Sequence, residues 1–285
     1  MDGHEAAQFE KKDGRARWSL AVKRVRLTLF GDMTVSNGST NRWMTFPLPN
    51  PEANLRLFCF PYAGGNPLIY RTWPFSLPAN VEVCAIQLPG HGNRLGEPLF
   101  NRLTPLIHAL AASLSPYLNK PFAFFGHSMG ALISFELTRL LRCAKLEQPR
   151  HLFVSGHRAP QTRDKKRKRT FELPEAEFIE ELRRLNGTPR EVLDHPELID
   201  LMTPILRADF AIAQTYEYVD ERPLDCHLTA LGGLRDKDVA RGHLEAWQTH
   251  TSGKFNVRMF PGDHFFLDTA RLSLLEIISM ELRRL

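Results

Sequence analysis

The chain has 285 residues, 43% of them hydrophobic, which indicates a soluble globular protein with one large α/β domain or two small ones. Its formal net charge of +5 favours acidic partners but is too small to indicate nucleic acid, so no nucleic-acid binding is expected. No apolar stretch approaches the roughly 20 residues of a membrane-spanning helix, so no membrane insertion is expected either.

The N-terminal region, residues 1–44, is polar and rich in turn-forming residues, and it contains no motif that we can interpret. We expect a flexible extension over 1–44, followed by one domain over 45–285. An alternative is that translation starts later, at Met33 or Met44.

Neither the N-terminus nor the cysteines indicate export. The N-terminus lacks an apolar signal core, and its early acidic residues argue against an organellar transit peptide. The four cysteines form no Cys-x-x-Cys pair, and free thiols are typical of a reducing compartment. We therefore expect a cytoplasmic protein.

Strand-like and helix-like segments alternate from residue 55 onward. A face of apolar residues at helical spacing runs from Leu103 to Tyr117, and a second helix pattern follows residue 130. The strand-like runs around these helices are 55–60, 81–86, 122–125 and 151–156. This alternation predicts an α/β fold with a mostly parallel central sheet and helices on both faces.

The alternation is interrupted between about residues 160 and 223. The interval is helical in pattern, chiefly over 177–185 and 196–216, and it contains no good strand. Helices inserted here would cover the carboxyl ends of the strands, where open α/β sheets bind ligands. We expect a helical lid. The alternation then resumes with strands at 226–231 and 255–260 and helices at 239–250 and 269–282.

The most informative motif is Gly126-His127-Ser128-Met129-Gly130, which lies between a predicted strand and a predicted helix. The pattern Gly-x-Ser-x-Gly in this context is the nucleophile elbow of the α/β-hydrolase fold. The turn is so tight that a side chain at either glycine would collide with the crossing strand or helix. Ser128 is therefore the candidate nucleophile, and we expect His127 to pack inside the elbow.

A serine nucleophile requires a base and an acid that orients the base. In this fold the acid and the histidine follow the serine in that order, each in a turn after a late strand. Asp236 and His264 meet this requirement. Asp238 is the nearest rival acid, whereas Asp263 adjoins the histidine too closely to reach round to its ring. The candidate triad is Ser128, Asp236 and His264.

The oxyanion that forms during attack requires two N–H donors. The residue after the nucleophile, Met129, supplies one. The other comes from the loop after the first core strand, and within Tyr62-Ala63-Gly64-Gly65 we select Ala63. An ordinary glycine turn is the alternative explanation for this loop.

No metal site and no cofactor are expected, because the histidines and cysteines lack ligand spacing and the chain contains no phosphate loop or dinucleotide fingerprint. The basic run 163–169 has three interpretations: a solvated loop, a docking site for an acidic partner, or a nuclear localisation signal.

Five segments of the sequence together resemble the type II thioesterases, the stand-alone enzymes of nonribosomal peptide and polyketide synthesis. The resemblance extends from about Trp43 to the C-terminus, and the segments that carry it are 57–65, 88–94, 125–131, 206–210 and 262–266. His91 departs from the family pattern, because many relatives have a basic residue, often arginine, at this place.

The resemblance implies an α/β-hydrolase with a lid, and it implies hydrolysis of acyl thioesters on the phosphopantetheine arms of acyl or peptidyl carrier proteins. The purpose in this family is to remove stalled or aberrant acyl groups. The catalytic positions of the family match Ser128, Asp236 and His264, and its oxyanion positions match Ala63 and Met129. We expect a monomer that needs no cofactor beyond the phosphopantetheine of its partner.

The alternatives are a generic carboxylesterase or lipase-like hydrolase, a fatty-acyl carrier thioesterase, and a non-catalytic binding protein on the same fold. Acyl-chain preference depends on the packing of the lid. The candidate determinants are Phe178, Leu182, Leu201, Ile205 and Phe210, although each of them could equally form the core of the lid itself.

Overall fold

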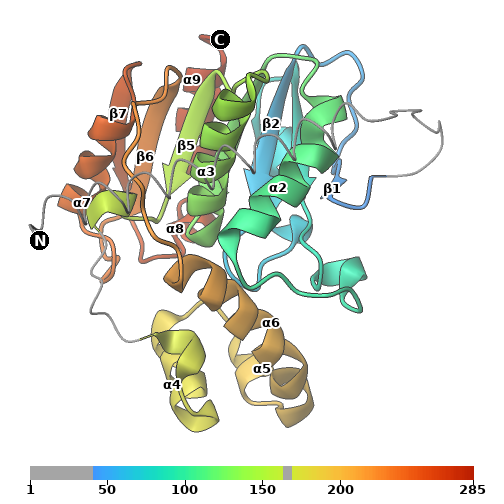
Figure 1. Ribbon diagram of the computed structural model, residues 1–285, viewed down its shortest axis with the longest axis vertical. Helices are drawn as coiled ribbons and strands as arrows, with labels where there is room; N and C mark the ends of the chain where they lie inside the picture. Colours follow the sequence, from blue (N-terminus) through green and yellow to red (C-terminus); the bar gives the residue numbers. More distant parts are fainter. Residues whose placement is uncertain (1–40, 163–168) are drawn as a thin grey trace, which may run out of the picture.

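In this computed structural model, which describes residues 41–162 and 169–285, seven strands form one sheet in the order β1-β3-β2-β4-β5-β6-β7 (Figure 1). All neighbouring strands are parallel except β1, which pairs with β3 in the antiparallel direction. The prediction of a mostly parallel sheet is confirmed. The strands are β1 (Met44–Thr45), β2 (Leu55–Phe60), β3 (Val81–Ile86), β4 (Phe122–His127), β5 (His151–Ser155), β6 (His227–Gly233) and β7 (Phe255–Phe260).

Strand β1 corrects the expected start of the domain. Met44 is buried and pairs with Ile86, and the side chain of Asn41 donates a hydrogen bond to the Ser113 carbonyl at 2.8 Å. Residues 41–44 therefore belong to the domain and not to the extension. A strand of two residues is too short to produce an alternating pattern, which is why the sequence does not reveal it. Residues 1–40 lie outside the described residues, so their flexibility stays a prediction.

Helices cover both faces of the sheet, as predicted. Alternate side chains of each strand point to opposite faces, so Phe58 packs in the apolar core beneath α2 and α3, whereas Leu57 packs in the core beneath α9. In Figure 1 α2 and α3 lie in front of the sheet and α9 lies behind it. The helices of the domain are α2 (Leu103–Leu114), α3 (Met129–Ala144), α7 (Arg241–Glu245), α8 (Phe266–Thr269) and α9 (Arg271–Leu282).

Two predicted helices are interrupted in the structure. The helix expected over 239–250 consists of α7 and a tighter 3₁₀ turn over Ala246–His250, a common way for a helix to end. The helix expected over 269–282 is divided at Ala270, whose φ of −115° and ψ of 26° separate α8 from α9.

The predicted lid is present and consists of α4 (Glu175–Leu185), α5 (Arg190–Leu193) and α6 (Pro196–Gln214). Figure 1 shows these helices beyond the carboxyl ends of the strands. The lid has an apolar core of its own, formed by Leu173, Phe178, Leu182, Leu193, Ile199 and Leu206. Within 41–162 and 169–285, no helix is long and apolar enough to cross a membrane. Most of the basic run 163–169 lies outside the described residues.

Candidate active site

Ser128 occupies a strained turn between β4 and α3. Its φ is 53° and its ψ is −116°, a conformation that costs a residue with a side chain on the order of 1–3 kcal/mol. The flanking glycines make this turn possible. A Cβ at Gly126 would lie 2.1 Å from the Gly130 carbonyl oxygen, and one at Gly130 would lie 2.2 Å from the Phe60 carbonyl oxygen. The steric reason given for the Gly-x-Ser-x-Gly motif is therefore confirmed.

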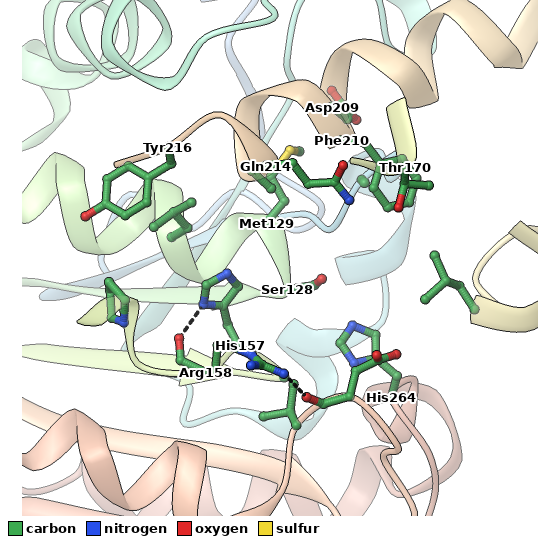
Figure 2. A pocket seen from close by; sticks show the side chains of 18 residues that line it. Ser128, Met129, His157, Arg158, Thr170, Asp209, Phe210, Gln214, Tyr216 and His264 are labelled. Atoms are coloured by element: carbon green, nitrogen blue, oxygen red, sulfur yellow. Dashed lines mark hydrogen bonds between the residues drawn. The ribbon is translucent and has the colours of Figure 1, made fainter. Parts of the chain in front are cut away.

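His264 and Asp236 meet beside Ser128. Nδ1 of His264 lies 2.7 Å from Oδ2 of Asp236, and the ring of His264 lines the same cavity as Ser128 (Figure 2). The other carboxylate oxygen of Asp236 accepts the backbone N–H groups of Asp238 and Val239, at 2.9 and 3.0 Å. This arrangement fixes the carboxylate and orients the imidazole, and it leaves Nε2 of His264 as the ring nitrogen that can exchange a proton.

The hydrogen bonds of Asp236 keep it ionised. Burial alone would raise its pKa, but the hydrogen bond and charge of His264 and the two backbone N–H groups hold that pKa below its ordinary value. An ionised Asp236 can stabilise the imidazolium that forms when His264 takes up a proton.

The rival acids serve other purposes. The Asp238 carboxylate lies 3.5 Å from Arg184, on the lid side of the site. Asp263 accepts the Phe265 backbone N–H at 2.9 Å, as expected of a turn residue. The structure therefore brings Asp236 to His264, in agreement with its position directly after strand β6.

His127 is fully buried beneath the ring of His264, with 5.2 Å between the ring centroids. Its Nδ1 lies 2.9 Å from the Ser155 hydroxyl. Burial, followed by the charge of His264, lowers the pKa of His127 well below its ordinary value. A neutral His127 adds no second positive charge under the imidazole, and its packing inside the elbow confirms the prediction.

The cavity around Ser128 has a volume of about 180 Å³. Ala63 and Met129, the predicted oxyanion donors, line it together with Ser128 and His264. Met129 is the first residue of α3, so its N–H belongs to the unpaired donors of a helix N-terminus. The structure thus gathers four of the five predicted site residues around one cavity, and the fifth, Asp236, contacts the ring of His264.

The lid contributes residues to the cavity that the sequence analysis missed. Of the five suggested determinants of chain length only Phe210 lines the cavity. Phe178 and Leu182 form the core of the lid, Ile205 is buried, and Leu201 is 46% exposed. Figure 2 shows Thr170, Gln214 and Tyr216 among the lining residues. Helical periodicity indicates which residues share a face but not which face meets the cavity.

Asp209 is a further residue that the sequence analysis did not single out. It lies on α6, is 1% exposed, and lines the cavity. Its Oδ2 atom accepts the Gly64 backbone N–H at 2.7 Å and lies 2.9 Å from Nε2 of His91. Only the likeness of segment 206–210 to the thioesterases pointed to this region.

Comparison with known proteins identifies the family. The family model of the thioesterase domain matches residues 55–282. Linear gramicidin dehydrogenase LgrE of Brevibacillus parabrevis is 47% identical over 254 residues, which are 88% of this chain and 96% of that protein. The gramicidin S biosynthesis protein GrsT of Aneurinibacillus migulanus is 45% identical, over 85% of this chain and 94% of that protein.

Among solved structures, the type II thioesterase BorB from the borrelidin biosynthetic cluster is similar, with a TM-score of 0.77 and 34% identity. The similarity covers 86% of this chain and 98% of BorB. From its matched residues, its relatives and its elbow, this chain belongs to the thioesterase family, in the α/β-hydrolase superfamily, and resembles the type II thioesterases of nonribosomal peptide and polyketide pathways.

Proposed function

We propose that the protein hydrolyses acyl thioesters carried on the phosphopantetheine arms of acyl or peptidyl carrier proteins, and that it removes stalled or aberrant acyl groups in nonribosomal peptide or polyketide synthesis. The observation that carries this proposal is the Asp236–His264 hydrogen bond of 2.7 Å beside the Ser128 elbow, in a chain of the thioesterase family.

The proposed reaction begins with attack by Ser128. Its hydroxyl proton passes to Nε2 of His264 while Oγ bonds to the thioester carbon. The backbone N–H groups of Ala63 and Met129 stabilise the resulting oxyanion. The C–S bond then breaks, His264 transfers its proton to the leaving sulfur, and the phosphopantetheine departs as the thiol. Water repeats the sequence on the acyl-serine: it gives a proton to His264, its oxygen bonds to the acyl carbon, and Ser128 leaves as the alcohol.

The same proposal covers partner, cofactor and assembly. One chain holds all five groups of the site, so a monomer suffices. Proton and acyl transfer of this kind use side chains and backbone N–H groups alone, so the proposed reaction needs no resident cofactor. Cys59, Cys84, Cys143 and Cys226 are free thiols, which suits the reducing cytoplasm that we propose as the place of action.

The test is release of acyl groups from a loaded carrier protein. Carrier protein charged with acetyl or a longer acyl group is incubated with wild type and with Ser128→Ala, and free acid is measured over time. Loss of the nucleophile should reduce the rate by several powers of ten. A wild type that cleaves simple esters quickly, yet releases carrier-bound acyl groups no faster than Ser128→Ala, would exclude carrier thioesters as the substrate.

We also propose that the basic run 163–169 contributes to the encounter with an acidic carrier protein. Of this run only Arg169 lies within the described residues, where it pairs with Glu172 at 3.0 Å and is mostly exposed. Neutralising the run should slow hydrolysis of carrier-bound acyl groups and spare small free thioesters. Equal losses on both substrates would contradict the proposal.

A further inference from the structure

A carboxylate of the lid forms a hydrogen bond with the loop that carries Ala63. Asp209 on α6 accepts the N–H of Gly64, the residue after Ala63, at an N···O distance of 2.7 Å. A buried carboxylate bound to a backbone N–H makes a short, strong hydrogen bond. The position of the Gly64 amide, and with it the peptide unit that leads on from Ala63, therefore depends on a lid residue 145 positions further along the chain.

The lid helix and this loop are also in close steric contact. Gly64 has a φ of +75°, and a Cβ built on it would lie 2.6 Å from a terminal carbon of Leu206, one turn before Asp209 on α6. The loop is thus pressed against the helix without room for a side chain. A shift of α6 away from the sheet would remove both this contact and the hydrogen-bond acceptor of Gly64.

His91 holds the carboxylate from the other side. Its Nδ1 lies 3.0 Å from the Pro89 carbonyl oxygen, and its Nε2 lies 2.9 Å from Oδ2 of Asp209. Both ring nitrogens face oxygen acceptors, so the arrangement is best satisfied by an imidazolium that donates from both. Burial opposes this charged form, but the hydrogen bond and charge of Asp209 outweigh it and raise the pKa of His91.

These contacts join three segments that are far apart in the sequence: the loop after β2, the loop after β3, and the lid helix α6. The two ionisable residues involved are buried, with His91 4% and Asp209 1% exposed. Breaking a buried pair of this kind leaves an uncompensated charge, which opposes partial separation of the lid from the two loops.

We infer that Asp209 is a positioning residue, through which the seated lid holds the loop of the Ala63 oxyanion donor in place. This inference rests on the proposed role of Ala63. It makes transition-state stabilisation dependent on lid position: with α6 displaced, Ser128, His264 and Asp236 remain assembled, but one oxyanion donor loses its support.

The test compares Asp209→Ala, Asp209→Asn and His91→Gln with the wild type. For each protein, kcat and KM are measured on p-nitrophenyl acetate and on an acetyl-loaded carrier protein. The inhibition constant of an alkyl trifluoromethyl ketone is also measured, because this compound forms a tetrahedral oxyanion with the serine. Removal of an oxyanion donor costs on the order of 100- to 1000-fold, so its displacement in Asp209→Ala should cost roughly 10- to 100-fold in kcat.

The variants should lose binding of the transition state and keep binding of the substrate. KM should change by less than about threefold, while ketone affinity falls by the same factor as kcat/KM. Asp209→Asn keeps an acceptor for Gly64 and should retain more activity than Asp209→Ala, and the backbone amide signal of Gly64 should shift in NMR spectra of both. If Asp209→Ala does not fold, Asp209→Asn and His91→Gln give the same comparison at smaller amplitude.

Arg207→Gln is the matched control. Arg207 lies on the same helix, but its guanidinium donates to the Phe171 carbonyl at 2.7 Å and stacks over Phe178, within the lid. This change should lower the thermal stability of the protein, but it should not weaken ketone binding while KM stays constant. If the Asp209 variants likewise lose only thermal stability and keep kcat and ketone affinity, the inference is wrong. Failure of the proposed function looks different: the wild type would cleave the ester but not the carrier thioester, and the Asp209 comparison would still be measurable on the ester.

Discussion

Nδ1 of His264 and Oδ2 of Asp236 lie 2.7 Å apart although the residues are 28 positions apart in the chain. The contact forms because β6 and β7 are adjacent parallel strands, so that the turns following them meet at one edge of the sheet.

Asp236→Asn should keep the fold and lose activity. An amide can still accept the backbone N–H groups of Asp238 and Val239, but it cannot stabilise the imidazolium and it favours the wrong tautomer of His264. We expect kcat to fall by about 10³- to 10⁴-fold with little change in melting temperature. Asp238→Asn, which alters the rival carboxylate, should cost much less, because this carboxylate faces Arg184 and not the ring of His264. A larger loss in Asp238→Asn than in Asp236→Asn would reverse the assignment of the acid.

Gly156→Ala should destabilise the protein. Gly156 follows β5 with a φ of +60°, and a Cβ there would lie 2.6 Å from Cε1 of the buried His127 ring. Strain of this kind added to overpacking costs about 2–4 kcal/mol of unfolding free energy, measurable by urea denaturation. Gly96→Ala is the control, because nothing lies within 4 Å of its Cβ position. Equal stability of the two variants would contradict the close packing around His127.

Stability should decrease in mild acid because of buried histidines. Burial lowers the pKa of His151 to about 3 and that of His250 to about 4. Between the ordinary histidine pKa of about 6.5 and these values the unfolded chain binds protons that the folded chain does not. The free energy of unfolding should therefore decrease as the pH is lowered, by at most about 1.4 kcal/mol per pH unit for each histidine.

Urea denaturation at pH 7, 6 and 5 measures this slope. His151→Gln should reduce this slope by up to about 1.4 kcal/mol per pH unit, the contribution of one buried histidine. A wild-type stability that does not decrease between pH 7 and pH 5 would show that protonation of these histidines does not favour the unfolded chain.

Ala213→Leu should shorten the preferred acyl chain. Ala213 is on α6 and lines the cavity of about 180 Å³, so a larger side chain reduces the space for the acyl group. We expect kcat/KM for hexanoyl thioesters to fall by about tenfold or more relative to acetyl thioesters, since one or two misplaced methylenes are worth 1–3 kcal/mol. Leu201→Ala, on the exposed side of the same helix, should keep the wild-type ratio.

The fold and the candidate triad could be predicted because local signals carry them. Parallel strands buried on both faces are apolar throughout, and the elbow needs glycines at fixed spacing. Closeness to the end of the preceding strand favoured Asp236 over Asp238, and a position in the turn after a late strand favoured His264 over the other histidines. β1 has only two residues and α5 only four, too few to show a period.

The lid shows where prediction from sequence fails. Phe178 and Phe210 lie on neighbouring helices with similar apolar surroundings, yet one is fully buried in the lid core and the other lines the cavity. The contact of Asp209 with Gly64 and His91 joins residues more than 100 positions apart. Neither feature has a local periodicity, because both depend on how the lid docks onto the sheet.

The lid is inserted between β5 and β6, which are neighbouring strands of the sheet. The chain between them has about 70 residues, and because the entropy of loop closure grows only with the logarithm of length, this costs about 1 kcal/mol more than a crossover of about 20 residues. Evolution can therefore lengthen, shorten or replace this insertion with little penalty to sheet assembly. Substrate range can diverge among relatives within the lid, while the strands that carry the nucleophile, the acid and the base keep their register.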